Sequence, residues 1–497
     1  MSPLTILLII AGYFGILMLI SFIVGRKGTD NDAFFLGNRK SPWWIVSIGM
    51  IGASLSGISF VSVPGMVGGI GFTYLQAVLG FFFGYLVVAN VLLPLYYKLN
   101  LTTIYTYLNK RFGKNSYKTG ASFFLLSKTI GAAVRLYIVV LILQTFVFDS
   151  LGIPFVVNVL LVVLLIWLYT FRSGIKTIVW TDSLQTIVMI GALVLILVQA
   201  VKAVNMDFGE MVSTLAQSEK TRIFVFDDWH STQNFFKQFF SGIFLVVVMT
   251  GLDQDMMQKN LTCKSLPEAK KNMYWHGIAF LPINFLFLAL GAVLLLLAAQ
   301  NNIALPAPDQ ILPMFASNYL GKTALTLFVI GIVAAAFSSA DSALTSLTTS
   351  FSVDILEVQH KDAAKAKRKR MKIHIGISLA FIVIILLFQV VNNRNAIDAI
   401  FTIVGYSYGP LLGMYAFGLF TKRQTKDKLV PYIAVASPVI CFALNWLSSN
   451  FFGYEFGWEL LMLNGALTFL GMWAVSSCHC GLDPQSHQLG DSETSSE

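Results

Sequence analysis

Long apolar runs recur along most of the chain and are separated by short polar segments. A helix needs about 20 apolar residues to cross the hydrocarbon core of a bilayer, and windows of that length predict thirteen transmembrane helices. The window 43–70 is unusually rich in Ser, Gly and Pro, so its helix is expected to be the least regular. The predicted spans are 4–24, 43–70, 72–97, 119–147, 154–171, 176–201, 235–257, 274–299, 321–350, 373–391, 396–420, 429–449 and 456–476.

The basic residues predict the orientation of these spans, because cytoplasmic loops of membrane proteins carry an excess of Lys and Arg. With the N-terminus outside, the loops predicted inside hold 26 of the 34 Lys and Arg residues, and the segments predicted outside hold six. We therefore expect a multi-pass protein of the cell (inner) membrane, with its N-terminus outside and its C-terminus in the cytoplasm. The inside loops are 25–42, 98–118, 172–176, 258–273, 351–372 and 421–428.

Composition supports an all-α polytopic membrane protein. Of 497 residues, 56% are hydrophobic and 12% are charged, whereas a soluble domain carries about 25% charged residues. The net charge of +9 lies mostly in the inside loops, and the basic run 365–372 is one of them, so no nucleic-acid partner is expected. The segment 477–497 predicts a disordered cytoplasmic tail. Cys478 and Cys480 are interpreted as part of that tail rather than as a metal site.

No motif of ATP hydrolysis or of hydrolytic catalysis occurs: Walker A, Gly-x-Ser-x-Gly and His-Glu-x-x-His are absent from the sequence. We therefore predict a protein that is not an enzyme. A channel is less favoured, because interrupted helices around a central polar site are typical of alternating access. A transporter-like sensor would carry a signalling domain after its spans, and here only the short polar tail follows them.

The stretch "GIVAAAFSSADSALTSLTTS" (331–350) turns an apolar helix into a run of hydroxyls around one carboxylate, Asp341. Its polar side chains share one broad stripe of a 3.6-residue helix and offer only oxygen atoms, which hard cations prefer as ligands. The serines alone would equally permit close helix packing; the aspartate among them favours a cation site. The stripe comprises Ala335, Ser338, Ser339, Asp341, Ser342 and Thr345.

A second unusual segment, "IGMIGASLSGISFVSVPGMVGG" (48–69), predicts a broken transmembrane helix. Glycine-rich interruption of a hydrophobic segment is the sequence pointer to a transporter binding site. Unwound backbone leaves carbonyl groups free for a cation, and the new helix ends favour charged groups of a substrate. A packing face of small residues is the alternative interpretation.

Charged residues inside the predicted spans are functional candidates, since a charge at mid-bilayer is costly. Lys128 and Arg135 lie seven residues apart on one helix face, and Arg135 calls for a carboxylate partner from either protein or substrate. Asp182 is either wetted by the cytoplasm or part of a second cation site. Asp253 and Asp255 lie near a cytoplasmic helix end, where a solvated or capping role is expected.

Several stretches together resemble the sodium:solute symporter family over nearly all of residues 1–476. The fold implied is the leucine-transporter type, with two inverted five-helix repeats. On that fold, the chain divides into a leading helix and loop (1–42), a first repeat (43–201), an extracellular loop (202–234), a second repeat (235–420), two closing helices (421–476) and the tail (477–497). The matching stretches are "FFLGNRKSPWWIVSIGMIGASLSGISF", "YTFRSGIKTIVWTDSLQ", "QKNLTCKSLPEAKKN", "AAAFSSADSALTSL" and "GYSYGPLLGMYAFGLFTKR".

The resemblance implies Na⁺ as the coupling ion and a first sodium site between the broken helix and the hydroxyl-rich helix. Its ligands would be backbone oxygens of Gly52, Leu55 and Ala335 with the hydroxyls of Ser338 and Ser339. Bacterial sialic acid transporters of this family have a second sodium site. Its counterparts here are Asp182, Asp341 and Ser342, and the carboxylate of Asp341 replaces a hydroxyl, so one or two sodium ions per cycle stay open.

The same transporters hold the carboxylate of the solute with an arginine and with hydroxyls of the broken helix. The counterparts are Arg135 and Ser54, Ser56 and Ser59, with Gln76 as a match that needs a gap in the alignment. We therefore expect sodium symport of a small carboxylate-bearing solute such as sialic acid, by a protein that works as a monomer in the bilayer. Neutral sugars, inositol, proline and pantothenate stay open as alternatives.

Overall fold

The computed structural model describes residues 3–25, 31–171, 174–358, 363–391, 396–454 and 456–477. The predicted tail beyond residue 477, with Cys478 and Cys480, lies outside these ranges.

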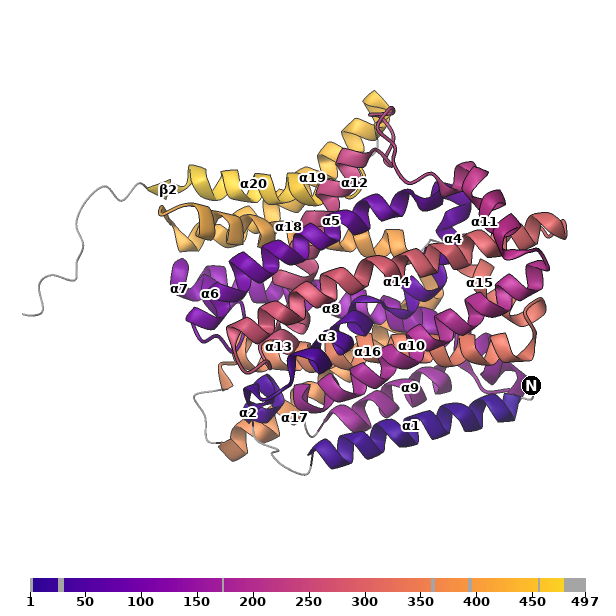
Figure 1. Ribbon diagram of the computed structural model, residues 1–497. Coiled ribbons are helices and arrows are strands. Elements are labelled where there is room, and N and C mark those ends of the chain that lie inside the picture. The colour runs from indigo at the N-terminus through magenta and orange to yellow at the C-terminus, as the bar shows by residue number, and fades with distance from the viewer. Residues whose placement is uncertain are drawn as a thin grey trace, which may run out of the picture.

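The chain is a bundle of long, roughly parallel and antiparallel helices (Figure 1). Each of the thirteen predicted spans coincides with a helix or with two helices joined at a break, so the predicted all-α fold is confirmed. The span helices are α1 (Pro3–Gly25), α3 (Trp43–Ser54), α4 (Gly57–Ile70), α5 (Tyr74–Val87), α6 (Leu93–Lys98), α8 (Lys114–Leu143), α9 (Phe155–Thr170), α10 (Ile175–Val204), α12 (Phe235–Val246), α13 (Gln254–Asn260), α14 (Leu266–Gln300), α16 (Gly321–Ser350), α17 (Ala363–Val391), α18 (Ala396–Phe420), α19 (Val430–Phe452) and α20 (Leu460–Ala474).

Short elements connect the spans. The connecting helices are α2 (Asn31–Leu36), α7 (Thr106–Arg111), α11 (Phe208–Gln217) and α15 (Pro308–Asn318). A two-stranded antiparallel sheet joins β1 (Gln424–Thr425) to β2 (Ser476–Ser477).

By length and composition alone, eight helices in the described ranges could cross a membrane, and the bent pair 235–251 and 254–260 would be a ninth. One of the eight, 57–98, has 42 residues, about twice what a bilayer needs. Gly71, at a φ of 63°, divides it into α4 and α5, and the chain turns back there (Figure 1). Together with α9, α18 and α20, this division gives the thirteen predicted spans.

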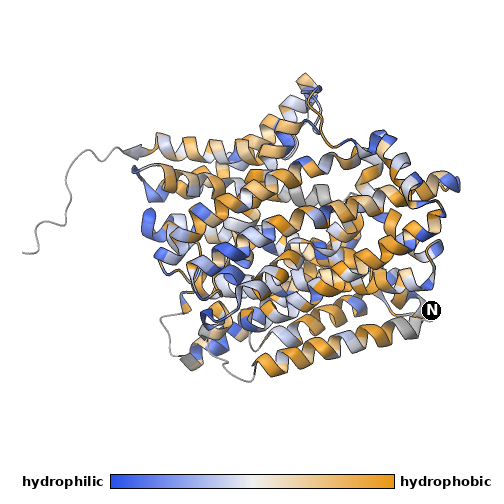
Figure 2. Cartoon of the chain, viewed as in Figure 1, coloured by the Kyte–Doolittle hydropathy of each residue, from blue (hydrophilic) through white to orange (hydrophobic). Residues whose placement is uncertain are grey.

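The hydroxyl-rich half of α16 lies in the centre of the bundle. Every residue from 331 to 350 is buried, so none of these hydroxyls faces lipid. In contrast, α1 lies at one edge of the bundle (Figure 1), with 17% of its apolar window buried. Hydrophobic residues cover α1 along its length, while hydrophilic residues gather mainly at the left-hand ends of the helices (Figure 2). The polar stripe of α16 is therefore an internal feature.

The first described helix begins on the right of Figure 1, and β2 lies on the left. An odd number of spans requires its two ends to lie on opposite faces in this way. Which face is cytoplasmic stays a prediction from the basic loops.

Glycines permit close backbone contacts within this bundle, and one contact holds α4 against α15. A Cβ at Gly65 would lie 1.9 Å from the carbonyl oxygen of Pro308, whereas a Cβ at Gly69, one turn later, would have nothing within 4 Å. We expect Gly65→Ala to lower the melting temperature in detergent, because overpacking costs about 1–3 kcal/mol. Gly69→Ala is the matched control and should leave it unchanged or slightly raised. Equal melting temperatures for the two variants would contradict this packing.

Candidate functional site

The first broken helix interrupts its backbone at Leu55 and Ser56. Leu55 ends α3 with φ −91° and ψ 88°, and Ser56 precedes α4 with φ −75° and ψ 169°. The break removes the N–H groups that would otherwise satisfy the carbonyls of the last turn of α3. It also creates two helix ends of opposite polarity, a negative one at the end of α3 and a positive one at the start of α4. The predicted break is confirmed.

A second break lies across the bundle. The α12 helix continues as a π-helical turn, η7 (Val247–Gly251), and the chain then bends by 68° into α13. Asp253 caps α13, since its Oδ1 accepts a hydrogen bond from the Asp255 N–H at 2.8 Å. Asp253 therefore has the expected capping role, but both aspartates are buried. The expectation of solvated carboxylates was wrong, because the bend turns α13 into the bundle.

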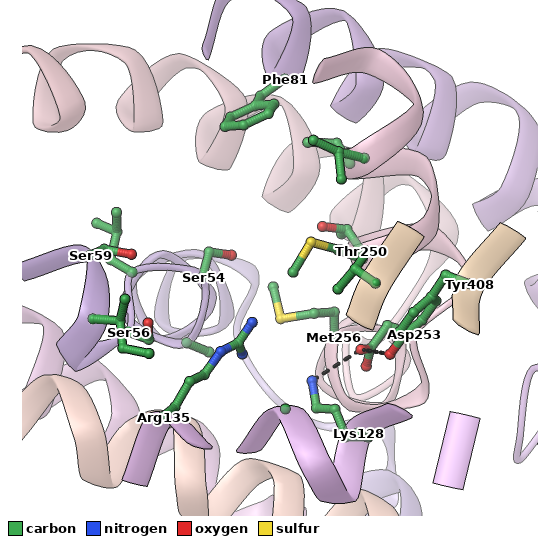
Figure 3. Close-up of a pocket in the computed structure, with 18 of the residues that line it drawn as sticks. Ser54, Ser56, Ser59, Phe81, Lys128, Arg135, Thr250, Asp253, Met256 and Tyr408 are labelled. Atoms are coloured by element: carbon green, nitrogen blue, oxygen red, sulfur yellow. Dashed lines mark hydrogen bonds and ion pairs between the residues drawn. The ribbon is translucent and has the colours of Figure 1, made fainter. Parts of the chain in front are cut away.

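A cavity lies between the two breaks (Figure 3). Its volume is about 130 Å³, whereas one water molecule needs about 10–15 Å³ on this measure, so there is room for a small organic molecule. Its polar and charged lining comes from both broken helices, α5, α8 and α18. These residues are Ser54, Ser56, Ser59, Tyr74, Tyr85, Ser127, Lys128, Arg135, Thr250, Asp253 and Tyr408.

Arg135 projects from α8 into this cavity, toward the side of the first break (Figure 3). Its Nε atom is buried and has no hydrogen-bond partner. Among the described residues, no carboxylate oxygen lies within 4.0 Å of its guanidinium. The alternative of a protein carboxylate as its ion-pair partner is therefore not met in this structure.

Lys128, two turns earlier on α8, is the cation that the protein itself neutralises. Its Nζ lies 3.0 Å from Oδ2 of Asp253 and 2.8 Å from Oδ2 of Asp255. The Tyr408 hydroxyl, on α18, donates to the same Asp253 oxygen at 2.7 Å. These contacts tie α8, the second break and α18 together along one wall of the cavity.

The predicted hydroxyl contacts lie at the first break. Ser54, Ser56 and Ser59 all line the cavity, and Ser56 makes no side-chain capping bond to α4. Ser54 Oγ is 3.3 Å from His276 Nε2, which is itself 2.9 Å from the Tyr85 hydroxyl. The structure therefore brings the three serines and Arg135 to one cavity.

Gln76 lies apart from them. It is fully buried, and its side chain holds the loop before α12. Its Nε2 donates to the Gln233 carbonyl at 2.9 Å, and its Oε1 accepts from the Val225 N–H at 3.0 Å. In this conformation its amide is occupied by the protein.

The first group of candidate sodium ligands lies where α16 passes the first break. A Cβ at Gly57, at the start of α4, would lie 3.4 Å from Ile332, one turn before Ala335. Ser338 Oγ is buried without a hydrogen-bond partner. Ser339 Oγ donates to the Ala335 carbonyl at 3.1 Å, which leaves its lone pairs for a cation.

The carbonyl groups of Gly52, in the last turn of α3, and of Leu55, directly after it, lie at the break. A Cβ at Gly52 would lie 2.0 Å from Thr186 Oγ1 on α10, so only glycine allows this approach. Within the described ranges, no group of three or more His, Cys, Asp or Glu side chains could hold a metal ion. Hydroxyl and carbonyl oxygens are therefore the candidate ligands for the first cation.

The second group has an unexpected member, Lys259. Its Nζ lies 2.7 Å from Oδ2 of Asp182, with 1% and 0% of the two side chains exposed. Ser342 Oγ donates to the same oxygen at 3.2 Å. The interpretation of Asp182 as wetted by the cytoplasm was wrong, and so was the assignment of Lys259 to a cytoplasmic loop. The bend before α13 folds this lysine into the bundle.

Asp341 is hydrogen-bonded to Tyr169 rather than to Lys259. Its Oδ2 accepts a hydrogen bond from the Tyr169 hydroxyl on α9 at 2.9 Å. Its Oδ1, like Oδ1 of Asp182 and the hydroxyl of Thr345, is buried without a partner. The polar stripe of α16 therefore retains unpaired oxygen atoms beside the Lys259 ion pair.

Several residues that build these groups are not predicted by local features of the sequence. Lys259 lies in "QDMMQKN", directly after a span, and only the bend identifies it as internal. Isolated hydroxyls in apolar helices do not indicate a site, and this applies to Tyr85, Thr250 and Tyr408. A single histidine in an apolar helix, His276, is equally uninformative.

The contrast between Lys128 and Arg135 gives a stability prediction. Lys128→Met leaves two buried carboxylates unpaired, and removing one partner of a buried pair costs about 3–5 kcal/mol. Arg135→Met breaks no ion pair and should lower the melting temperature far less. Thermal unfolding of both purified variants without any solute measures the difference. An Arg135→Met protein that melts as low as Lys128→Met would show that Arg135 has a structural partner.

Comparisons with known proteins agree with this architecture. The family model of the sodium:solute symporter family matches residues 34–428. The sodium/sialic acid symporter of Proteus mirabilis is 27% identical over 90% of each chain, and that of Aliivibrio fischeri is 26% identical over 92% of this chain and 91% of its own. The human sodium/iodide cotransporter is 24% identical over 82% of this chain and 65% of its own.

The fold is shared with a solved structure of a Na⁺-coupled sialic acid symporter in a substrate-bound outward-open state. The TM-score is 0.80 at 23% identity, over 95% of this chain and 96% of that one. The predicted fold type and the predicted family are therefore confirmed, as is Na⁺ as the coupling ion. The chain belongs to the sodium:solute symporter family.

Proposed function

We propose that the protein imports a small carboxylate-bearing solute together with Na⁺ by alternating access, and that sialic acid is such a solute. The observation that carries this proposal is the guanidinium of Arg135, which points into the cavity with no described carboxylate oxygen within 4.0 Å. The relatives that transport sialic acid with sodium support the choice of solute. A neutral sugar or inositol lacks the anionic group that would neutralise this arginine, whereas an amino acid carries a carboxylate.

Two features on the same side of the cavity suit a carboxylate. Arg135 presents a planar fork of N–H donors that matches a carboxylate in bidentate geometry. The N-terminus of α4 adds a positive helix end, and Ser56 and Ser59 lie beside it with hydroxyl donors. An anion bound there would contact both features, while the hydroxyls of a sugar acid would extend toward Tyr85, Thr250 and Asp253.

The proposed first sodium site uses the other end of the same break. Carbonyls of Gly52 and Leu55 lie at the negative end of α3, and Ala335, Ser338 and Ser339 supply oxygens from α16. Five oxygen ligands of this kind suit a hard cation. Leu55 borders both the sodium group and the cavity, so sodium would fix the backbone that carries the solute contacts. Loss of sodium to the cytoplasm would loosen this joint and release the solute.

We further propose that the protein is a monomer of the inner membrane, with its N-terminus outside, without enzymatic activity and without a nucleic-acid partner. The chain would also contain two inverted repeats, residues 43–201 and 235–420. A broken helix at the start of each segment supports that division. The left-hand face in Figure 1 would then be cytoplasmic.

Ser339→Ala tests the sodium site. It removes one of five proposed oxygen ligands, so we expect the Na⁺ concentration for half-maximal stabilisation to rise at least tenfold, while the protein stays folded. The matched control is Ser346→Ala, since Ser346 lies two turns later on α16 and donates to the Ala343 carbonyl in the same way. The measurement is the melting temperature of purified protein titrated with NaCl at constant ionic strength. Normal sodium affinity in Ser339→Ala would remove Ser339 from the site.

Arg135 tests the nature of the solute. Lysine keeps the charge but loses the fork, so Arg135→Lys should weaken sialic acid binding markedly and Arg135→Ala should abolish it. Sodium binding to the solute-free protein should change little, because the guanidinium lies at the cavity rather than at the α16 oxygens. Calorimetric titration of both variants with N-acetylneuraminate in NaCl measures the loss. Unchanged affinity in Arg135→Ala would exclude an anion held by this arginine.

A further inference from the structure

The ion pair of Lys259 and Asp182 bears on how many sodium ions the protein binds, a question that rests on the proposed sodium coupling. The family resemblance places a second sodium site at Asp182, Asp341 and Ser342. In this structure the Lys259 ammonium lies 2.7 Å from Asp182 Oδ2, and Ser342 donates to that same oxygen. The residues present therefore do not fit a Na⁺ at this carboxylate oxygen, because a tethered cation already holds it.

Lys259 reaches this position through the second broken helix. The 68° bend at Leu252 and Asp253 directs α13 into the bundle, where it packs against α16 and α3. The start of α13 is held by the Asp253 cap and by the ion pair of Asp255 with Lys128. Both ends of this short helix are therefore fixed by charged contacts, and the lysine at its end has a defined place.

The burial of the pair makes it persistent. Neither side chain has more than 1% of its surface exposed, so separating the two charges would leave both without water. Removing one partner of such a pair is strongly unfavourable. A Na⁺ ion at Asp182 Oδ2 would have to displace the ammonium from its ion pair, and a Na⁺ ion at the unpaired Oδ1 would share a carboxylate whose charge Lys259 already neutralises.

The local charges also suit one sodium ion rather than two. When both are ionised, Asp182 and Asp341 bring two negative charges, and Lys259 neutralises one of them. Asp341 lies one turn from Ser338 on the same stripe of α16, so its charge attracts the ion at the first site. One Na⁺ there makes the group of three side chains neutral, and a second would leave it with a positive charge in a buried place.

We infer that Lys259 takes the place of the second sodium ion, so that the solute-free protein binds one Na⁺. Removing the lysine alone should open a second site at Asp182. Removing the lysine and the Asp182 charge together should close it again. The double variant is therefore the matched control for the single one.

The test counts bound sodium by equilibrium dialysis of the purified full-length protein against radiolabelled Na⁺, with choline chloride holding ionic strength constant. We expect one ion in the wild type, two in Lys259→Gln, and one in Asp182→Asn/Lys259→Gln. Two ions in the wild type would overturn the inference and leave the proposed sodium coupling intact. Zero ions in the wild type would overturn the sodium coupling itself.

Asp182→Asn keeps the inference testable if Lys259→Gln does not fold. Because Lys259 rather than Na⁺ occupies Asp182 in the wild type, this variant should still bind one ion. A count that falls from two in the wild type to one in Asp182→Asn would show that Asp182 is a sodium ligand after all.

Discussion

The interruption of the first broken helix at Leu55 and Ser56 is the constraint on which the rest of the site depends. Unpaired backbone groups at membrane depth are tolerated only where protein surrounds them or where they line a polar cavity. Here both conditions hold, since α10 and α16 pack against the break and the cavity opens beside it. The break supplies a negative helix end toward α16 and a positive one toward Arg135. The same break in the backbone therefore forms part of a candidate cation site and of a candidate anion site next to each other.

Close packing holds that arrangement in place. Gly52 allows α3 to contact Thr186 on α10, and Gly57 allows α4 to contact Val139 on α8. A side chain at either position would displace one of the two helices that meet at the break. Movement of the break relative to α16 would alter the sodium oxygens and the serine hydroxyls together. This shared scaffold is the physical link between ion binding and solute binding.

Two buried lysines are neutralised by carboxylates of the protein. Lys128 is paired with Asp253 and Asp255, and Lys259 with Asp182. Arg135 lines the same cavity as Asp253, but no described carboxylate oxygen lies within 4.0 Å of its guanidinium. These ion pairs connect the helices around the site, whereas the guanidinium of Arg135 is available to form an ion pair with a bound anion. A neutral solute would leave the guanidinium of Arg135 without an anionic partner.

Much of this architecture was predictable from local features of the sequence. The spans follow from the length of the apolar runs, and the first break follows from Gly, Ser and Pro within one run. The hydroxyl stripe of α16 follows from helical periodicity. Its complete burial agrees with the prediction that these hydroxyls face the interior of the protein. The ion pair of Lys259 was not predictable, because its partner lies far away in the sequence and only the bend before α13 brings them together. The hydrogen bonds of Gln76 were not predictable either, because its partners belong to a loop without a periodic pattern.

Uptake by reconstituted protein tests the central claim most directly. Proteoliposomes would be loaded with choline buffer and given radiolabelled N-acetylneuraminate with an inward Na⁺ gradient or with an equal gradient of choline. The account predicts accumulation above the external concentration with the Na⁺ gradient, equilibration or less with choline, and competition by other carboxylate-bearing sugars but not by their neutral counterparts. Accumulation that is the same in choline, or uptake of neutral sugars with no effect of the acid, would contradict sodium-coupled import of a carboxylate-bearing solute.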